Sequence, residues 1–194
     1  MKYYRMVFDC NESNGLAMCA DADLKGMDMH CTYKGVSIKD TWKKPVIPLD
    51  PKEGKNYSDL LWNLFNWTIV SSNFILLTQN ITKEAVEYLD VDIVDTVRHT
   101  VCTDYKVANV IDVIDALDME RSVYTIQEYE QQKILGVHVY VLKRDKLKGH
   151  EIFRLSGDTK PIFVSENIRR VVLDNSLTGF EFWPVKAVNS TKMH

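Results

Sequence analysis

The sequence has few of the features that identify common classes of protein. Of its 194 residues only four are cysteines, too few and too scattered for a disulfide framework: Cys10, Cys19, Cys31 and Cys102. Its apolar runs, such as Phe74 to Leu77, are far shorter than the roughly 20 residues that span a bilayer. The N-terminus lacks the apolar core of a signal peptide. The sequence therefore predicts a cytoplasmic protein with no membrane partner.

Motifs for catalysis are also missing. The chain contains no phosphate-binding glycine loop, no nucleophile elbow, no paired-histidine zinc motif and no dinucleotide fingerprint. His99, His138 and His150 are the histidines best suited to acid–base chemistry, but none lies near a nucleophile motif. We therefore predict no catalytic residue and no cofactor, and keep a small cytoplasmic hydrolase as an alternative function.

Two clusters of possible metal ligands lack a recognised spacing. Soft ligands for copper or zinc gather in CADADLKGMDMHC: Cys19, Met27, Met29, His30 and Cys31. Their spacing fits no zinc pattern, and cysteine and methionine commonly fill protein cores. The carboxylates of Asp112, Asp115 and Asp118 lack the glycine that lets a calcium loop turn sharply. The sequence therefore predicts no metal site.

What the sequence does have is an uneven distribution of charge. Between Glu84 and Glu130 it has twelve acidic and three basic residues, a net charge of −9 that leaves +6 for the rest of the chain. An acidic surface attracts a basic partner and repels nucleic acid. The candidate partner-binding residues are Asp112, Asp115, Asp118 and Glu120. Solvated loops and strand faces would give the same charge pattern without a partner.

Two further groups of residues could contact a partner. The basic cluster KRDKLKGH contains Lys143, Arg144, Lys146 and Lys148. No nucleic-acid-binding module accompanies it, so we interpret it as a polar connector and expect no nucleic-acid partner. Aromatic residues often dominate binding energy at interfaces, and Trp42, Trp62 and Trp183 are candidates for this role. Core packing is the interpretation that we prefer for all three.

Strand patterns outnumber helix patterns and do not alternate regularly with them. Alternating apolar residues predict strands over 3–8, 134–142 and 151–155, whereas the apolar stripe after Ser58 predicts a capped helix. This order favours an α+β fold with a mostly antiparallel or mixed sheet and a few short helices. We expect N-terminal strands and a proline-rich connector in 1–56 and a main α+β domain in 57–194, or one compact domain.

Two segments share a strand–serine–helix–strand pattern. VSSNF at 70–74 matches VSENI at 164–168, and each is followed by apolar residues at helical spacing and then by an alternating strand. In each, the first serine follows a short apolar run and can accept hydrogen bonds from the free amides of the next turn. The sequence therefore predicts two related units, with Ser71 and Ser165 as helix caps.

The second unit resembles the C-terminal signature of a bacterial immunity-protein family, the family called immunity protein eleven, found beside polymorphic toxins. The matching residues are Ile152-Phe153-Arg154, Ile162-Phe163-Val164-Ser165-Glu166, Leu177-Thr178-Gly179-Phe180 and Pro184-Val185. NVIDVIDALDMERS at 109–122 and the opening MKYYRMVFD are similar to other segments of that family. The chain departs from the family pattern at 16–51, and Ser72 stands where the second unit has Glu166.

The resemblance implies an α+β fold and a cognate toxin domain as protein partner, bound in the cytoplasm of the producing cell. It implies no catalytic site and transfers no functional residue. We therefore predict an immunity protein that binds and neutralises a bacterial toxin. A small hydrolase and a regulatory or scaffold module are the alternatives.

Overall fold

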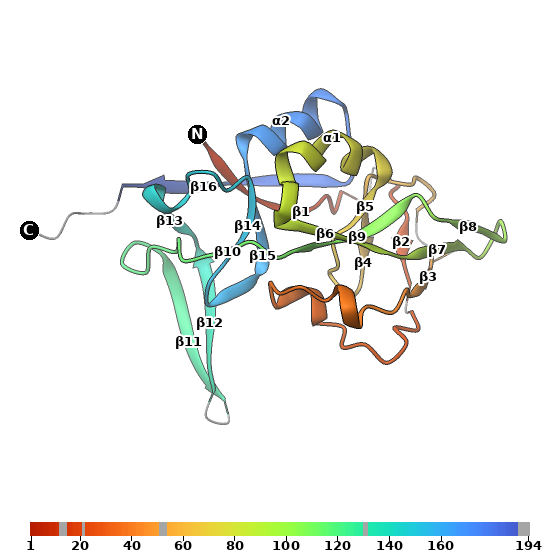
Figure 1. Ribbon diagram of the computed structural model, residues 1–194, viewed down its shortest axis with the longest axis horizontal. Coiled ribbons are helices and arrows are strands. Elements are labelled where there is room, and N and C mark those ends of the chain that lie inside the picture. Colours follow the sequence, from red (N-terminus) through yellow and green to blue (C-terminus); the bar gives the residue numbers. More distant parts are fainter. Residues whose placement is uncertain (12–14, 21, 51–53, 130–131, 190–194) are drawn as a thin grey trace, which may run out of the picture.

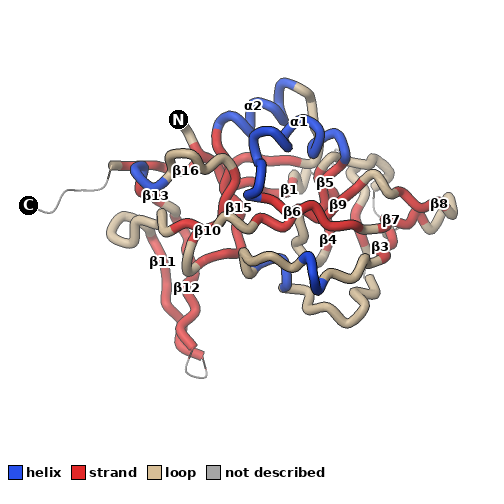
Figure 2. The backbone as a smooth tube through the Cα atoms, in the orientation of Figure 1, coloured by secondary structure: helices blue, strands red, loops and turns tan. Residues whose placement is uncertain are grey.

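Two α-helices lie side by side against one face of two β-sheets (Figures 1 and 2). The computed structural model describes residues 1–11, 15–20, 22–50, 54–129 and 132–189. The helices are α1 (Ser72–Thr82) and α2 (Glu166–Asp174). Strands dominate the rest of the described chain and pair in mixed or antiparallel sheets, which confirms the predicted α+β class.

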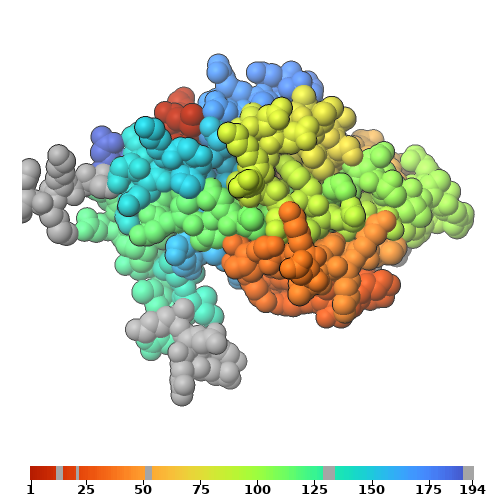
Figure 3. Space-filling view, in the orientation of Figure 1, coloured from red at the N-terminus to blue at the C-terminus, as the bar shows by residue number. Residues whose placement is uncertain are grey.

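The strands form two large and two small sheets. The first large sheet has the order β2 (Met18–Cys19), β4 (Leu60–Asn63), β5 (Ile69–Ser71), β9 (Tyr105–Val110) and β6 (Val86–Asp90). The second has the order β10 (Val113–Ile114), β14 (Ile152–Leu155), β15 (Asp158–Ser165), β1 (Tyr3–Phe8), β16 (Phe180–Val188) and β13 (Val141–Lys143). One small sheet consists of β3 (Val46–Pro48), β7 (Asp92–Asp95) and β8 (Thr100–Cys102). The other is the hairpin of β11 (Val123–Tyr129) and β12 (Gln132–Val139), which projects from the rest of the molecule (Figure 3).

The two large sheets share the same order and direction of five strands, and equivalent residues pair between their strands. In the first, β4, β5, β9 and β6 pair antiparallel in that order, and β2 is parallel to β4. In the second, β14, β15, β1 and β16 pair antiparallel, and β10 is parallel to β14. Ser71 pairs with Tyr105 just as Ser165 pairs with Tyr3. The first unit thus consists of β2, β4, β5, α1, β6 and β9, and the second of β10, β14, β15, α2, β16 and β1.

A serine begins each helix, as predicted. Ser71 Oγ accepts a hydrogen bond from the amide three residues on at 3.2 Å. Ser165 Oγ accepts from the amides two and three residues on, at 3.1 and 3.5 Å. The two hydroxyls also donate hydrogen bonds to equivalent carboxylates. Ser71 donates to Asp59, just before β4, and Ser165 donates to Glu151, just before β14. The repeat therefore extends from backbone register to side-chain hydrogen bonds.

Three cores hold the layers together. One lies between the helices and both large sheets and includes Tyr4, Met6, Val70, Phe74, Val164 and Ile168. The opposite face of the first sheet packs against the small three-stranded sheet and residues 22–50, here called the N-terminal segment. The opposite face of the second sheet packs against 114–117 and the β13 region. The helices thus cover one face of each sheet, and different parts of the chain pack against parts of the opposite face.

The N-terminal segment is held to the first unit by hydrogen bonds from two tryptophan side chains to backbone carbonyl groups. Trp67 Nε1 donates to Met29 O at 2.7 Å, and Trp42 Nε1 donates to Asp90 O at 2.9 Å. In Figure 1 the segment lies on the side away from the two helices. The sequence contains no short motif for these contacts, because their partners lie far along the chain.

The helix predicted after Ser58 is wrong, since Leu60–Asn63 forms β4. Leu60 packs in the core below the helices, whereas Leu61 packs in the core on the other face of the sheet. A strand buried on both faces shows a continuous apolar run instead of alternation, and such a run also matches one face of a helix. Ser58 Oγ donates to Leu60 O at 2.6 Å and caps no helix.

Gly179 lies where the second unit meets the first. Its φ is +86°, and a Cβ here would come within 2.3 Å of Leu60 O. Thr178 on one side accepts a hydrogen bond from Leu60 N at 3.1 Å and donates from its own amide to Asp59 Oδ2 at 2.9 Å. The glycine in Leu-Thr-Gly therefore serves both a left-handed turn and a close backbone approach.

Candidate partner-binding surfaces

The four carboxylates predicted to bind a partner do not share one environment. Asp118 has an exposed fraction of only 4%. Its carboxylate accepts hydrogen bonds from Arg121 Nη1 at 2.6 Å and from the amides of Glu120 and Arg121 at 3.2 Å. Burial alone would raise the pKa of Asp118, but these hydrogen bonds outweigh it and hold the pKa below its usual value. Asp118 therefore stabilises the turn before β11.

The other three carboxylates are more accessible. Asp112 Oδ2 lies 2.6 Å from His150 Nδ1. Asp115 is exposed, with its carboxylate 3.6 Å from Lys143 Nζ, and Glu120 is exposed as well. Asp115 and Glu120 are thus the members of this group that a partner could reach without disturbing the fold.

The Asp112–His150 pair lines a cavity of about 500 Å³ beside the C-terminal end of α1. Within the described ranges, no serine, threonine or cysteine side chain is hydrogen-bonded to His150, so the pair lacks an activated nucleophile. His138 contacts Thr125 on the hairpin at 3.2 Å, and His99 lies in the turn before β8. The three candidate histidines therefore lie apart from one another.

The soft ligands between Cys19 and Cys31 are not gathered into a metal site among the described residues. Cys19 is fully buried, and burial raises the pKa of its thiol to about 12, which disfavours the thiolate that a metal needs. The Sδ atom of Met27 is already engaged, since it accepts a hydrogen bond from Lys43 N at 3.2 Å. In the part of the chain that the structure describes, no three His, Cys, Asp or Glu side chains are grouped to hold a metal.

A groove of about 570 Å³ lies between the second sheet and the neighbouring parts of the first unit and the N-terminal segment. Its lining includes Arg5, Lys160, Glu181 and Trp183 from the second sheet, and Tyr33 and Trp62 from across the groove. Arg5, Glu181 and Trp183 belong to the face of the sheet that is turned away from the helices, because their neighbours in the strands, Tyr4, Met6 and Phe182, pack below the helices. The groove therefore combines aromatic surface with both signs of charge.

Arg5 is the most unusual residue of the groove. Its guanidinium carbon lies 5.5 Å from the centre of the Trp183 ring and 5.9 Å from that of Tyr140. Its Nε atom is buried without a hydrogen-bond partner, and Arg5 forms no ion pair with any described residue. Cation–π contact holds the guanidinium in place while its hydrogen-bonding capacity stays unused.

Two of the three tryptophans contradict the preferred interpretation of core packing. Trp42 packs against the core of the first unit, but the exposed fractions of Trp62 and Trp183 are 36% and 48%. The alternation in Phe180-Glu181-Phe182-Trp183 could have revealed this, because it places Trp183 on the same face as a glutamate. Arg5 carried no such signal, since its surroundings come from strands far apart in the sequence.

The chain was compared with known families and proteins. Residues 11–187 match the model of a family described as "Immunity protein family (Imm11)". No curated protein matches the chain. Among the described residues, no helix is both long and apolar enough to cross a membrane.

Proposed function

Because the chain belongs to the Imm11 immunity protein family, we propose that it binds the toxin domain of a cognate polymorphic toxin and neutralises it in the cytoplasm of the producing cell. The observation that carries the proposal is the family match over residues 11–187. This family is not enzymatic. Neutralisation then depends on a complementary surface that occupies or distorts the toxin, and one immunity fold can meet toxins of different chemistry.

The acidic stretch supports a role in capturing a basic toxin. Asp115 and Glu120 are exposed, and they lie within the region that carries a net charge of −9. Charges at the rim of an interface mainly raise the rate of association and its dependence on salt. Asp112 and Asp118 add negative charge to the same region, although the main role of Asp118 is to stabilise its own turn through hydrogen bonds.

Co-expression with the toxin tests the function as a whole. The toxin domain encoded beside the gene of this chain is expressed in cells with and without the chain. We expect the chain to restore growth and to co-purify with the toxin domain in equal amounts. Toxicity that persists, with no complex on size-exclusion chromatography, would contradict the proposal and favour a regulatory or scaffold role.

The acidic stretch is tested by charge reversal in the same complex. Asp115→Lys with Glu120→Lys should slow association by about tenfold at low salt and flatten its salt dependence, with little change in dissociation. Asp40→Lys with Asp174→Lys is the matched control, since it makes the same charge change at two exposed positions elsewhere. Equal association rates for the two double variants would rule out steering by the acidic stretch.

A further inference from the structure

The repeat allows each position on the face turned away from the helices to be compared between the two units. On the first sheet the central positions of this face are Glu87, Leu89, Val107 and Asn109. Their equivalents on the second sheet, by strand register, are Glu181, Trp183, Arg5 and Val7. We call the first set the covered face and the second set the open face, for the reason that follows.

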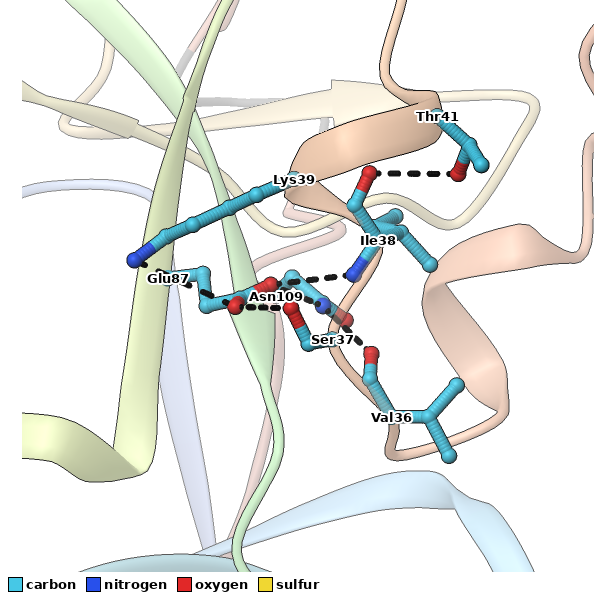
Figure 4. Close-up of polar contacts among 7 residues, drawn as sticks. All are labelled: Val36, Ser37, Ile38, Lys39, Thr41, Glu87 and Asn109. Carbon is cyan, nitrogen blue, oxygen red and sulfur yellow. Dashed lines mark hydrogen bonds and ion pairs between the residues drawn. The ribbon is translucent and has the colours of Figure 1, made fainter.

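On the covered face the chain binds a segment of its own. Leu89 and Val107 have exposed fractions of 4% and 0%. Ser37 Oγ and Ile38 N donate to the Glu87 carboxylate at 2.5 and 3.2 Å. Figure 4 shows how this carboxylate gathers the residues around it.

The neighbouring amide completes the docking of this segment. Asn109 Nδ2 donates to Val36 O at 2.9 Å and to Glu87 Oε2 at 3.1 Å, and Lys39 Nζ lies 3.9 Å from Glu87 Oε1 (Figure 4). Burial would raise the pKa of Glu87, but the hydrogen bonds from Ser37, Asn109 and Ile38 outweigh it and lower the pKa. A carboxylate and an amide on adjacent strands therefore hold three residues of irregular chain against the sheet.

On the open face no described segment of the chain is hydrogen-bonded to the equivalent side chains, and Arg5 has only aromatic contacts with Tyr140 and Trp183. Trp183 stands at the position of Leu89 and is 48% exposed. Glu181 stands at the position of Glu87, is exposed, and has neither a hydrogen bond nor an ion pair with any described residue. Arg5 replaces Val107 and puts an unpaired cation, with its buried Nε atom unpartnered, at the centre of the face.

We propose that the open face is the docking surface for an extended segment of the toxin domain, which supplies a carboxylate to Arg5 and a hydroxyl or main-chain amide to Glu181. This inference rests on the proposed function. A half-buried guanidinium without a counter-ion is matched by a carboxylate, which it can bind through two parallel N–H···O bonds. Lys160 in the groove adds to the positive charge, and Glu181 at its far side selects donors as Glu87 does in the first unit.

The aromatic lining gives the apolar part of the contact. Trp62 and Trp183 line opposite sides of the groove of about 570 Å³, and both are accessible. Tryptophan and arginine are the residue types that most often dominate binding energy, above all at the centre of an interface from which water is excluded. We therefore expect the open face to determine the lifetime of the complex, whereas the acidic stretch determines how fast it forms.

The test measures binding of the purified chain to the toxin domain encoded beside its gene. Arg5→Glu should raise the dissociation constant at least about thirtyfold, and Trp183→Ala at least about tenfold. Arg5→Lys keeps the charge but loses the planar fork, so its loss should be smaller. Arg170→Glu, on the exposed side of α2, makes the same charge change as Arg5→Glu and should change the dissociation constant by less than about threefold.

A further variant keeps the test valid if Arg5→Glu fails to fold. Glu181→Ala removes an exposed side chain with no partner in the described structure, so the free protein should be unaffected while binding weakens about fivefold. A lysine scan of the toxin's acidic residues should also find one reversal that restores binding to Arg5→Glu, which identifies the paired carboxylate.

The possible results separate this inference from the proposed function. If the wild-type chain binds and protects but all open-face variants bind within threefold, the open-face inference is wrong and the function stands. If the wild-type chain neither binds nor protects, both fail. If open-face variants only change a dimer of this chain into monomers, the occupant is a second copy, and the inference is again wrong.

Discussion

The two units of the molecule share strand order, register and helix caps, yet they differ in what covers the face turned away from the helices. Leu89 and Trp183 occupy equivalent positions, but the first is 4% exposed and the second 48%. Glu87 binds the N-terminal segment, whereas Glu181 binds no described residue. In the first unit a segment of the chain completes this face, whereas in the second unit the described chain supplies no such segment, and this difference is the basis of the proposed docking surface.

A second difference concerns the strands β4 and β14. Trp62 in β4 is equivalent to Arg154 in β14, because both pair with the short parallel strand beside them. Arg154 is 2% exposed, and its guanidinium donates to four carbonyl groups, those of Thr32, Val110, Thr159 and Lys160. Burial lowers the pKa of Arg154 to about 10. The arginine thus joins the second unit to the N-terminal segment that covers the first.

The largest effect is expected from removing that link. Arg154→Met leaves buried carbonyl groups without their donors and should lower the free energy of unfolding by about 3 kcal/mol or more. The equivalent change in the first unit, Trp62→Met, alters a partly exposed side chain and should cost no more than about 1 kcal/mol. Urea denaturation of both variants checks this. Equal losses of unfolding free energy in the two variants would mean that Arg154 and Trp62 contribute equally to stability, which would contradict the proposed difference between the units.

The next effect compares the two glutamates directly. Glu87→Ala removes the acceptor of Ser37 Oγ and Ile38 N and one of the two acceptors of Asn109 Nδ2, and should cost about 2 kcal/mol of stability. Glu181→Ala should stay within about 0.5 kcal/mol, because its side chain is exposed. Amide hydrogen exchange should also speed up around 36–39 in Glu87→Ala alone. A stability loss in Glu181→Ala as large as in Glu87→Ala would show that Glu181 already has a structural partner.

Much of this repeat could be predicted from the sequence, because local rules control it. Ser71 and Ser165 were predicted as caps from their place after an apolar run, and both caps are confirmed. The α+β class and the strands at 3–8 and 151–155 follow from alternation and order. The family resemblance, carried by the C-terminal motif, is confirmed by the match over residues 11–187. The boundary expected at residue 56 stays a prediction.

What could not be predicted depends on distant contacts. β1 begins the chain but lies between β15 and β16, so its Arg5 meets Trp183 only in the folded protein. The spacing of Asp112, Asp115 and Asp118 predicts a row of surface carboxylates, but Asp118 is buried and accepts hydrogen bonds within its own turn. The apolar run after Ser58 predicts a helix because burial on both faces of β4 hides the period of a strand.

The helix caps give a smaller effect that tests the equivalence of the units. Ser71→Ala and Ser165→Ala should each lower the free energy of unfolding by about 1 kcal/mol, since each removes one side-chain acceptor from a helix N-terminus. The double variant should lose the sum of the two, because each serine caps its own helix. Thermal unfolding of the three variants checks this, with Asn73→Ala, at an exposed position in the first turn of the same helix, as control. A loss confined to one unit would show that only one cap still stabilises its helix.

The smallest effect is a change in how stability depends on pH. The pKa of Glu87 is lowered in the folded protein, so its hydrogen bonds contribute stability above about pH 4.3, the ordinary value of a glutamate, and lose it as the pH falls through the lower folded value. Glu87→Gln removes this titration and should flatten the acid limb of a plot of unfolding free energy against pH. Glu181→Gln, at the exposed equivalent position, is the control for the loss of one carboxylate. Because Glu87 is one of 27 acidic residues, the difference will show as a change of slope and not as a loss of the acid transition. Equal flattening by both substitutions would mean that the effect does not depend on the hydrogen bonds that Glu87 accepts.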